Sequence, residues 1–246
     1  MNLDNAVFIT GAGISVESGI KPFRGVSGIW EENPMEMATF RKFMTDPGFF
    51  LSWYYQRFVS CRNALPNLTH QTLSERGYRV ITQNVDGLHR KANHPDENLI
   101  EIHGYIEQKR KVDAISRTEL IEADWDKVDE SRLVESLFEL FQISTQGEVN
   151  PKKSLRPHIL LFDEYYTELY QIQKAMQWVN EADTVVFMGT SNAVGITEGI
   201  LSIAVDHHKQ VVVVDPAPVS SLCVPGAKIF QMSASEFTKS LSKYLN

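Results

Sequence analysis

Short runs of consecutive apolar residues recur along the chain, and each run ends in small or polar residues. Hydrophobicity that continues without alternation is typical of strands buried on both faces, as in a parallel sheet. The pattern predicts six strands, at Ala6–Thr10, Arg79–Thr82, Leu99–Ile102, His158–Phe162, Thr184–Met188 and Val211–Val214. Apolar spacing predicts helices at Pro47–Cys61, Asn67–Arg76, Glu168–Glu181, Thr197–His208 and Ser235–Leu245. This alternation predicts an α/β fold with a doubly wound parallel sheet.

Two stretches of the chain interrupt this alternation. Residues 25–63 are rich in aromatic side chains at helical spacing, and residues 105–154 contain an acidic segment. Between Asp113 and Glu139 there are nine acidic and three basic residues, so much of the net charge lies there. Apolar residues within 133–141 recur at helical spacing, which predicts that one face of this segment packs down. The acidic face is then either a solvated outer surface or a docking surface.

The composition excludes several classes of protein. A chain of 246 residues and 28.0 kDa suits one large domain with a modest insertion, and 43% hydrophobic and 22% charged residues exclude a disordered chain or a coiled coil. No apolar run approaches the roughly 20 residues that cross a bilayer, and no basic segment precedes the first apolar run as in a secretory signal. We therefore expect a cytoplasmic protein with no membrane partner. The net charge of −7 argues against a nucleic-acid partner bound through its phosphates.

The chain has two cysteines, Cys61 and Cys223, which lie far apart in the sequence. They cannot form a Cys-x-x-Cys pair, so a structural zinc site built from the cysteines of one chain is excluded. We expect two reduced thiols, and a disulfide is the alternative.

The first candidate for chemistry follows the first predicted strand. There the sequence reads Gly11-Ala12-Gly13-Ile14-Ser15, and glycines between a strand and a helix let backbone N–H groups approach a pyrophosphate. The usual third glycine of a dinucleotide fingerprint is replaced by Val16, so a simple tight turn remains an equal interpretation. Shortly afterwards, Phe23 would cover a ring and Arg24 would contact phosphate, unless they are a core and a surface residue.

The carboxyl ends of four further predicted strands also carry polar or small residues. These are Gln83, Asn84 and Asp86, then His103, then Gly189, Thr190 and Ser191, and finally Asp215. Ligands of open α/β sheets bind beyond these strand ends, and a histidine there is a candidate general base because its pKa is close to neutral. Turn formation is the alternative for the Asn and Asp residues. Together, the five clusters indicate a nucleotide-binding enzyme, without indicating its reaction.

The motifs GAGISVESGI…FRG, TQNVDGLH, IHG, LRPHILLF and GTSN resemble those of the sirtuins, which are NAD-dependent protein deacylases. They match in the same order from about Val7 to Ala234. The resemblance implies that NAD is consumed as a co-substrate. It also implies a Rossmann-like NAD-binding domain of residues 1–24, 64–104 and 155–246, and a smaller helical domain formed by two insertions, residues 25–63 and 105–154.

The resemblance also assigns roles to individual residues. In this family nicotinamide leaves NAD, the acyl oxygen of a lysine side chain attacks the ribose, and a histidine deprotonates a ribose hydroxyl. The products are nicotinamide, free lysine and O-acyl-ADP-ribose. His103 matches the catalytic base, Asn84 the residue that orients ribose or water, and Asp86 the residue that holds the nicotinamide amide. The residues that match NAD contacts are Gly11, Ala12, Gly13, Ser15, Phe23, Arg24, Gln83, Asn84, Asp86, His103, Gly189, Thr190, Ser191, Asp215 (where the family usually has Asn) and Ala234.

A finer resemblance concerns the aromatic stretch. Tyr54 and Arg57 form a Tyr-x-x-Arg motif where the branch of the family that removes malonyl or succinyl groups carries one. An arginine with a tyrosine hydroxyl would bind the distal carboxylate of such an acyl group. The alternative is an ordinary surface pair at helical spacing.

Three features depart from the family pattern. Lys111, Ala114, Asn150 and Lys153 stand where the family carries its zinc-binding cysteines, so the resemblance implies a member without zinc. Pro22 replaces an aspartate near the nicotinamide, and Asp163 replaces a glycine beside the strand that pairs with the substrate peptide.

The expected partner is therefore an acyl-lysine protein or peptide, and the sequence does not predict the oligomeric state. The departures at Pro22 and Asp163 leave an alternative enzyme open, an NAD glycohydrolase or a protein ADP-ribosyltransferase on the same scaffold. A non-catalytic NAD-binding sensor is the second alternative.

Overall fold

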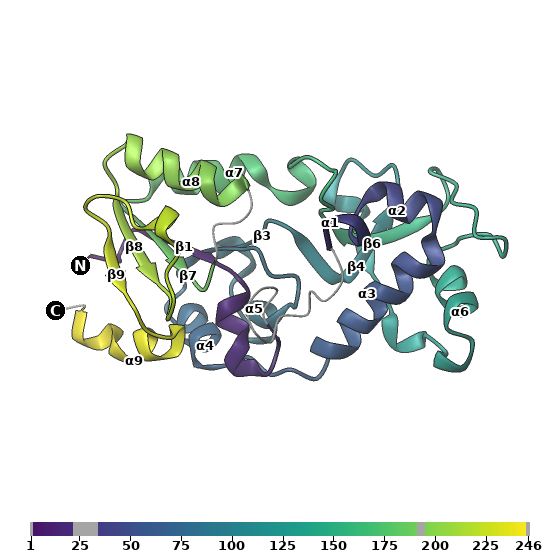
Figure 1. The fold of residues 1–246 in the computed structure, drawn as a ribbon, viewed down its shortest axis with the longest axis horizontal. Helices are drawn as coiled ribbons and strands as arrows, with labels where there is room; N and C mark the ends of the chain where they lie inside the picture. The colour runs from purple at the N-terminus through teal and green to yellow at the C-terminus, as the bar shows by residue number, and fades with distance from the viewer. Residues whose placement is uncertain (1, 22–33, 191–194, 245–246) are drawn as a thin grey trace.

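The computed structural model describes residues 2–21, 34–190 and 195–244 (Figure 1). Its larger sheet has six parallel strands in the order β3-β2-β1-β7-β8-β9. Their bounds are β1 Ala6–Thr10, β2 Arg79–Thr82, β3 Leu99–Glu101, β7 Thr184–Met188, β8 Gln210–Val214 and β9 Lys228–Phe230. The doubly wound α/β fold predicted from the hydrophobic pattern is confirmed.

Helices cover both faces of this sheet (Figure 1). On one face lie α7 (Ile172–Glu181) and α8 (Gly195–Asp206), and on the other α4 (Leu68–Glu75) and α9 (Ala234–Tyr244). Successive side chains of a strand point to opposite faces, so Ile9 packs in the core beneath α7 and α8 while Phe8 packs in the core against α4 and α9. Burial on both faces explains why the inner strands β1 and β7 are buried along their whole length and largely apolar.

A second, antiparallel sheet in the order β5-β4-β6 lies beside the larger one. It consists of β4 Gly104–Lys111, β5 Ile121–Glu122 and β6 Leu155–Ile159, and it packs with α2 Phe40–Thr45, α3 Pro47–Cys61 and α6 Leu133–Leu140. The short helix α1 Pro34–Met37 precedes α2. Aromatic side chains form much of the shared core, among them Phe43, Phe50 and Trp125. The acidic segment thus does pack one apolar face down, as its spacing predicts.

The prediction of a parallel strand at His158–Phe162 is wrong. The strand there begins at Leu155, ends at Ile159 and pairs antiparallel with β4. A short apolar run does not reveal its pairing partner, because that choice depends on contacts far away in the sequence. Strand β4 escapes the hydrophobic pattern because five of its eight residues, from Glu107 to Lys111, are polar or charged. The domain boundaries inferred from the resemblance remain predictions.

Local signals explain where the best-predicted helix begins. Helix α3 has Pro47 in its first turn, and the Asp46 carboxylate accepts a hydrogen bond from the N–H of Phe49. A proline needs no amide partner in the first turn, and a carboxylate at the N-cap satisfies an otherwise unpaired donor. The remaining helices are α5 Leu88–Lys91 and short 3-10 helices at Ala12–Ser18, Asp96–Asn98, Arg117–Glu119, Trp125–Lys127, Glu130–Arg132, Glu168–Tyr170 and Ser220–Leu222.

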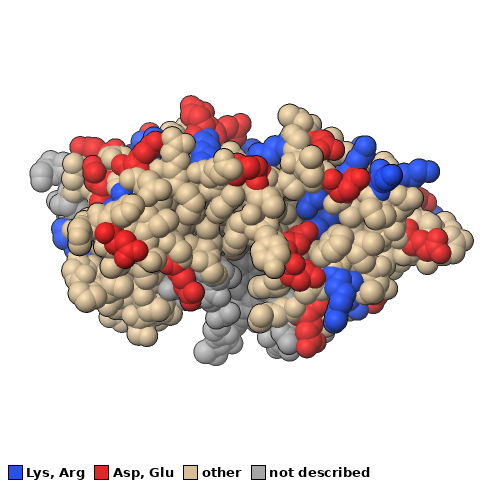
Figure 2. All heavy atoms as spheres, turned by 90° about the horizontal axis from the view of Figure 1, so that it is seen from above, with Lys and Arg blue, Asp and Glu red and all other residues tan. Residues whose placement is uncertain are grey.

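The surface carries charges of both signs. On the face drawn in Figure 2, Asp and Glu side chains alternate with Lys and Arg, without a continuous basic area among the described residues. Within those residues, no helix combines the length and the apolar character that a membrane span requires.

Candidate active site

The candidate residues gather where the order of the parallel strands reverses. The chain moves from β1 outward to β2 and β3, and then returns to the other side of β1 as β7. In open α/β sheets, the loops at the carboxyl ends of the two strands on either side of this reversal separate and leave room for a ligand. The loops that follow β1, β2, β3 and β7 all meet here.

The glycines of the first loop are required by contact with the loop after β7. The N–H of Gly13 donates to the carbonyl oxygen of Gly189 at 2.9 Å, and that of Gly11 to the carbonyl of Met188 at 3.1 Å. A Cβ atom on Gly13 would lie 2.6 Å from the Cα atom of Gly189, which itself has a φ of +61°. Such a separation is too short for any side chain, so both loops need glycine. The tight turn and the candidate ligand loop are therefore the same structure.

Side chains from the loop after β2 interlock with the first loop. The Asn84 amide Nδ2 donates to the Gly11 carbonyl at 3.0 Å and to Ser15 Oγ at 3.1 Å. Ser15 Oγ in turn donates to Asp86 Oδ2 at 2.7 Å, and the N–H of Leu88 donates to Asp86 Oδ1 at 3.0 Å. Asn84, Asp86 and Ser15 are all buried. Burial raises the pKa of Asp86, and the hydrogen bonds from Leu88 and Ser15 oppose that rise.

Gln83 joins the loops after β2, β3 and β7. Its Nε2 donates to Thr190 Oγ1 at 3.0 Å, and its Oε1 accepts from Thr197 Oγ1 of α8 at 3.5 Å. The backbone carbonyl of Gln83 lies 3.0 Å from His103 Nδ1. The predicted residues Gln83, His103 and Thr190 are thus brought together.

The other ring nitrogen of His103 contacts a residue that sequence reasoning missed. His103 Nε2 lies 2.8 Å from the hydroxyl of Tyr166. Burial lowers the pKa of His103 to about 4, so the imidazole is neutral at physiological pH. No spacing rule connects these two residues, because Tyr166 follows the antiparallel strand β6.

Two further predicted residues lie apart from this network. The Asp215 carboxylate, after β8, accepts a hydrogen bond from the N–H of Ala217 at 2.8 Å, which is the turn interpretation of this residue. Ala234 begins α9 and is buried with Phe237 in the core on the face of the sheet that α4 and α9 cover. Phe23, Arg24 and Ser191, as well as the departure at Pro22, lie outside the described residues.

Arg57 reaches the network from the smaller sheet's side of the molecule. It lines a narrow pocket together with Ser15, Asn84, Asp86 and Cys61. Its guanidinium lies 5.2 Å from the centre of the Trp53 ring, and burial lowers its pKa. Tyr54 is 3% exposed and packs against Phe50 and Trp53. It is therefore a core residue, about one helical turn before Arg57 in α3.

Asp163 caps a helix. Its carboxylate accepts hydrogen bonds from the backbone N–H groups of Phe40 and Arg41, at 2.6 and 3.0 Å. These amides are among the first of α2 and have no partners within the helix. The side chain that replaces the family's glycine is therefore turned toward α2.

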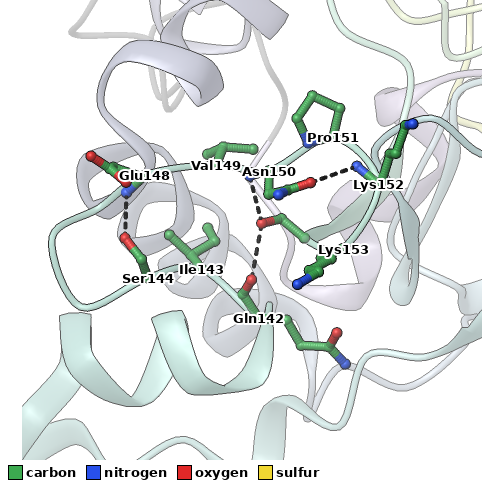
Figure 3. A pocket seen from close by; sticks show the side chains of 10 residues that line it. Gln142, Ile143, Ser144, Glu148, Val149, Asn150, Pro151, Lys152 and Lys153 are labelled. Atoms are coloured by element: carbon green, nitrogen blue, oxygen red, sulfur yellow. Dashed lines mark hydrogen bonds between the residues drawn. The ribbon is translucent and has the colours of Figure 1, made fainter.

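The positions of the family's zinc ligands do not fit a zinc ion. Figure 3 shows the loop of residues 142–154, in which Ser154 Oγ accepts from the N–H of Asn150 at 3.0 Å and donates to the Gln142 carbonyl at 2.9 Å. Asn150 Oδ1 accepts from the N–H of Lys152 at 3.0 Å. Structural zinc is held by thiolates and imidazoles, whereas this loop uses hydroxyl and amide groups. Among the described residues, no group of three or more His, Cys, Asp or Glu could hold a metal ion.

Comparison with known proteins places this geometry in a family. The family model described as the Sir2 family matches residues 11–195. The NAD-dependent deacetylase sir2E of Dictyostelium discoideum is 37% identical in an alignment 228 positions long, which covers 83% of this chain and 63% of that protein. An NAD-dependent protein deacylase of Bacteroides thetaiotaomicron is 29% identical in an alignment 248 positions long, which covers 99% of this chain and 98% of that one.

A solved structure shows the same fold. An ADP-ribose complex of a mutant Sir2 homologue aligns with a TM-score of 0.80 and 26% identity, covering 98% of this chain and 91% of that one. The resemblance seen in the sequence motifs is thereby confirmed. The chain belongs to the Sir2 family, the sirtuins.

Proposed function

We propose that this Sir2 family protein removes acyl groups from lysine side chains of proteins, consumes NAD and releases nicotinamide and O-acyl-ADP-ribose. The observation that carries the proposal is the network at the strand reversal, where Ser15, Asn84 and Asp86 interlock beside His103. A preorganised set of polar groups at this point favours binding and chemistry on a nucleotide.

The contacts within the network indicate which atoms remain to face NAD. Both Nδ2 protons of Asn84 are used inside the protein, which orients its Oδ1 as the acceptor for a ribose hydroxyl or water. Each oxygen of Asp86 accepts one hydrogen bond and retains a lone pair for the nicotinamide amide. His103, neutral at physiological pH, accepts a proton from a ribose hydroxyl.

The loops that meet at the reversal would hold the rest of NAD. The phosphates would lie against the backbone of the first loop, Gly11 to Gly13, where it contacts the loop of Gly189 and Thr190. Asp215 at the end of β8 and Ala234 at the start of α9 would face the adenosine end. The protein would thus bind the dinucleotide across five loops.

An acidic acyl group is the finer proposal. Arg57 and Lys21 both line the pocket beside Asn84 and Asp86. The planar guanidinium of Arg57 would pair with the distal carboxylate of a succinyl or malonyl group. Tyr54 supports this arrangement from the core, since its ring packs against Trp53, the ring that Arg57 covers. Because Asp163 caps α2, its side chain is directed away from a bound peptide in this proposal.

The test is nicotinamide release from NAD, with mass spectrometry of the products. The purified protein is incubated without peptide and with matched acetyl-, succinyl- and malonyl-lysine peptides. Release that depends on peptide, together with O-acyl-ADP-ribose, is the expected result. Peptide-independent formation of ADP-ribose would instead show an NAD glycohydrolase, and ADP-ribose attached to protein would show a transferase.

A further inference from the structure

Tyr166 contacts the nitrogen of His103 on which the proposed chemistry depends. The Gln83 carbonyl oxygen can only accept a hydrogen bond, so His103 Nδ1, 3.0 Å away, must carry the proton. In the neutral ring, Nε2 then presents its lone pair, and the hydroxyl 2.8 Å away donates to it. The two contacts together select one tautomer of the imidazole.

The position of Tyr166 is built into the fold. Its ring packs against the apolar core between the parallel sheet and α7 and α8, and its centre lies 5.9 Å from that of the imidazole. The neighbouring Tyr165 is 87% exposed. One tyrosine of the pair is therefore directed into the site and the other into solvent.

The surroundings of the pair leave the hydroxyl a neutral donor. Burial raises the pKa of Tyr166, so the phenol keeps its proton at physiological pH. Burial lowers the pKa of His103 and the hydrogen bond to the Gln83 carbonyl opposes that effect, while the Tyr166 hydroxyl is in direct contact with the imidazole. Its hydroxyl stabilises the neutral imidazole relative to the charged form.

We propose that Tyr166 is a positioning residue for His103, which locks the tautomer with Nε2 as the base and occupies that nitrogen until a ribose hydroxyl takes its place. The proposal rests on the deacylase function for its last step. There the ribose O–H bond breaks, its proton moves to Nε2, and the Gln83 carbonyl stabilises the resulting imidazolium through Nδ1–H. The tyrosine keeps its own proton throughout.

The test compares Tyr166→Phe with Tyr165→Phe as the matched control, beginning with the protein free of NAD. Long-range ¹H–¹⁵N NMR of the histidine rings reports the tautomer and the pKa of His103. We expect the proton on Nδ1 in the wild type and, in Tyr166→Phe alone, a rise in the His103 pKa of about half to one unit, the size expected for one lost hydrogen bond. A proton on Nε2, or identical titration in the wild type and Tyr166→Phe, would overturn the proposal.

Activity then tests the link to the reaction. In Tyr166→Phe, the acid limb of the pH profile of kcat/KM moves upward by the same amount as the NMR titration, while Tyr165→Phe keeps the wild-type profile. A titration that shifts without any shift of the acid limb would overturn the role in positioning the base. If deacylation itself is absent, the NMR result still decides the tautomer, so failure of the proposed function is recognised separately.

Discussion

At the scale of single residues, His103 is the residue on which the proposed reaction depends most. Its imidazole lies between the Gln83 carbonyl and the Tyr166 hydroxyl, and neither contact involves the loop glycines that would hold phosphate. We expect His103→Ala to lower kcat by at least about 100-fold, a usual contribution of a general base. Calorimetry should show NAD affinity largely retained. Unchanged turnover in this variant would contradict the assignment of the base.

Arg57 carries the prediction about the acyl group. Arg57→Met should weaken kcat/KM for succinyl-lysine peptides about 10- to 100-fold, because a charge-assisted pair to the distal carboxylate is lost. The acetyl-lysine peptide is the internal control, and it should be affected much less. Arg57→Lys keeps the charge without the planar guanidinium, so its kcat/KM for succinyl-lysine peptides should lie between those of the wild type and Arg57→Met. Equal losses on acetyl and succinyl peptides would rule out the acidic-acyl pocket.

At the scale of elements, the loop of residues 142–154 includes Asn150 and Lys153, which stand where the family carries zinc-binding cysteines. Hydrogen bonds within the loop stabilise it. Ser154 is 1% exposed, and its hydroxyl joins Asn150 to Gln142. Ser154→Ala leaves both partners unsatisfied, which costs about 1–3 kcal/mol and should lower Tm by about 2–12 °C.

Ser144→Ala is the matched control for this loop. The Ser144 hydroxyl accepts one exposed hydrogen bond, from the N–H of Glu148, so its removal should change Tm by less than about 2 °C. A strong chelator should leave the Tm of all three proteins unchanged. A large fall in the wild-type Tm on chelation would show that a metal ion stabilises the loop after all.

The elements also show the reach and the limit of the hydrophobic pattern. Helix α3 and strands β1, β2 and β7 begin and end where the pattern predicts, because apolar runs and an N-cap are local signals. Strand β9 is short and lies at the edge of the sheet, where Lys228 and Ile229 are exposed, so it presents no buried run. The strand is recognised by its parallel pairing with β8, which the hydrophobic pattern does not reveal.

At the scale of the whole molecule, buried histidines make stability depend on pH. Burial lowers the pKa of His70 to about 4 and that of His158 to about 3, and it also lowers the pKa values of His89 and His94. Groups whose pKa is depressed in the folded state bind protons more readily when unfolded. Their stabilisation is therefore complete above pH 6.5, the ordinary histidine value, and is lost as the pH falls toward 4.

We expect Tm to fall by several degrees between pH 7 and pH 5, as measured by thermal unfolding. Burial raises the pKa values of Asp86 and Glu101, which act in the opposite direction, but the histidines outnumber them. His158→Phe is a direct check, since neither ring nitrogen of His158 has a hydrogen-bond partner among the described residues and its ring stacks on Tyr170. This variant should show a shallower fall with acid, and a Tm independent of pH would refute the account.

Local patterns in the chain were sufficient for the fold class, for most strands and for the five clusters of polar residues at strand ends. These features depend on which residues follow one another, and hydrophobic runs, glycines and strand-end polar groups record that directly. Contacts between distant segments decided the rest. They placed β6 in the antiparallel sheet, turned Asp163 toward α2, and brought Tyr166 to His103 across 63 positions of the sequence. Such choices minimise unsatisfied polar groups and fill the core of the assembled molecule, so no single stretch of sequence contains them.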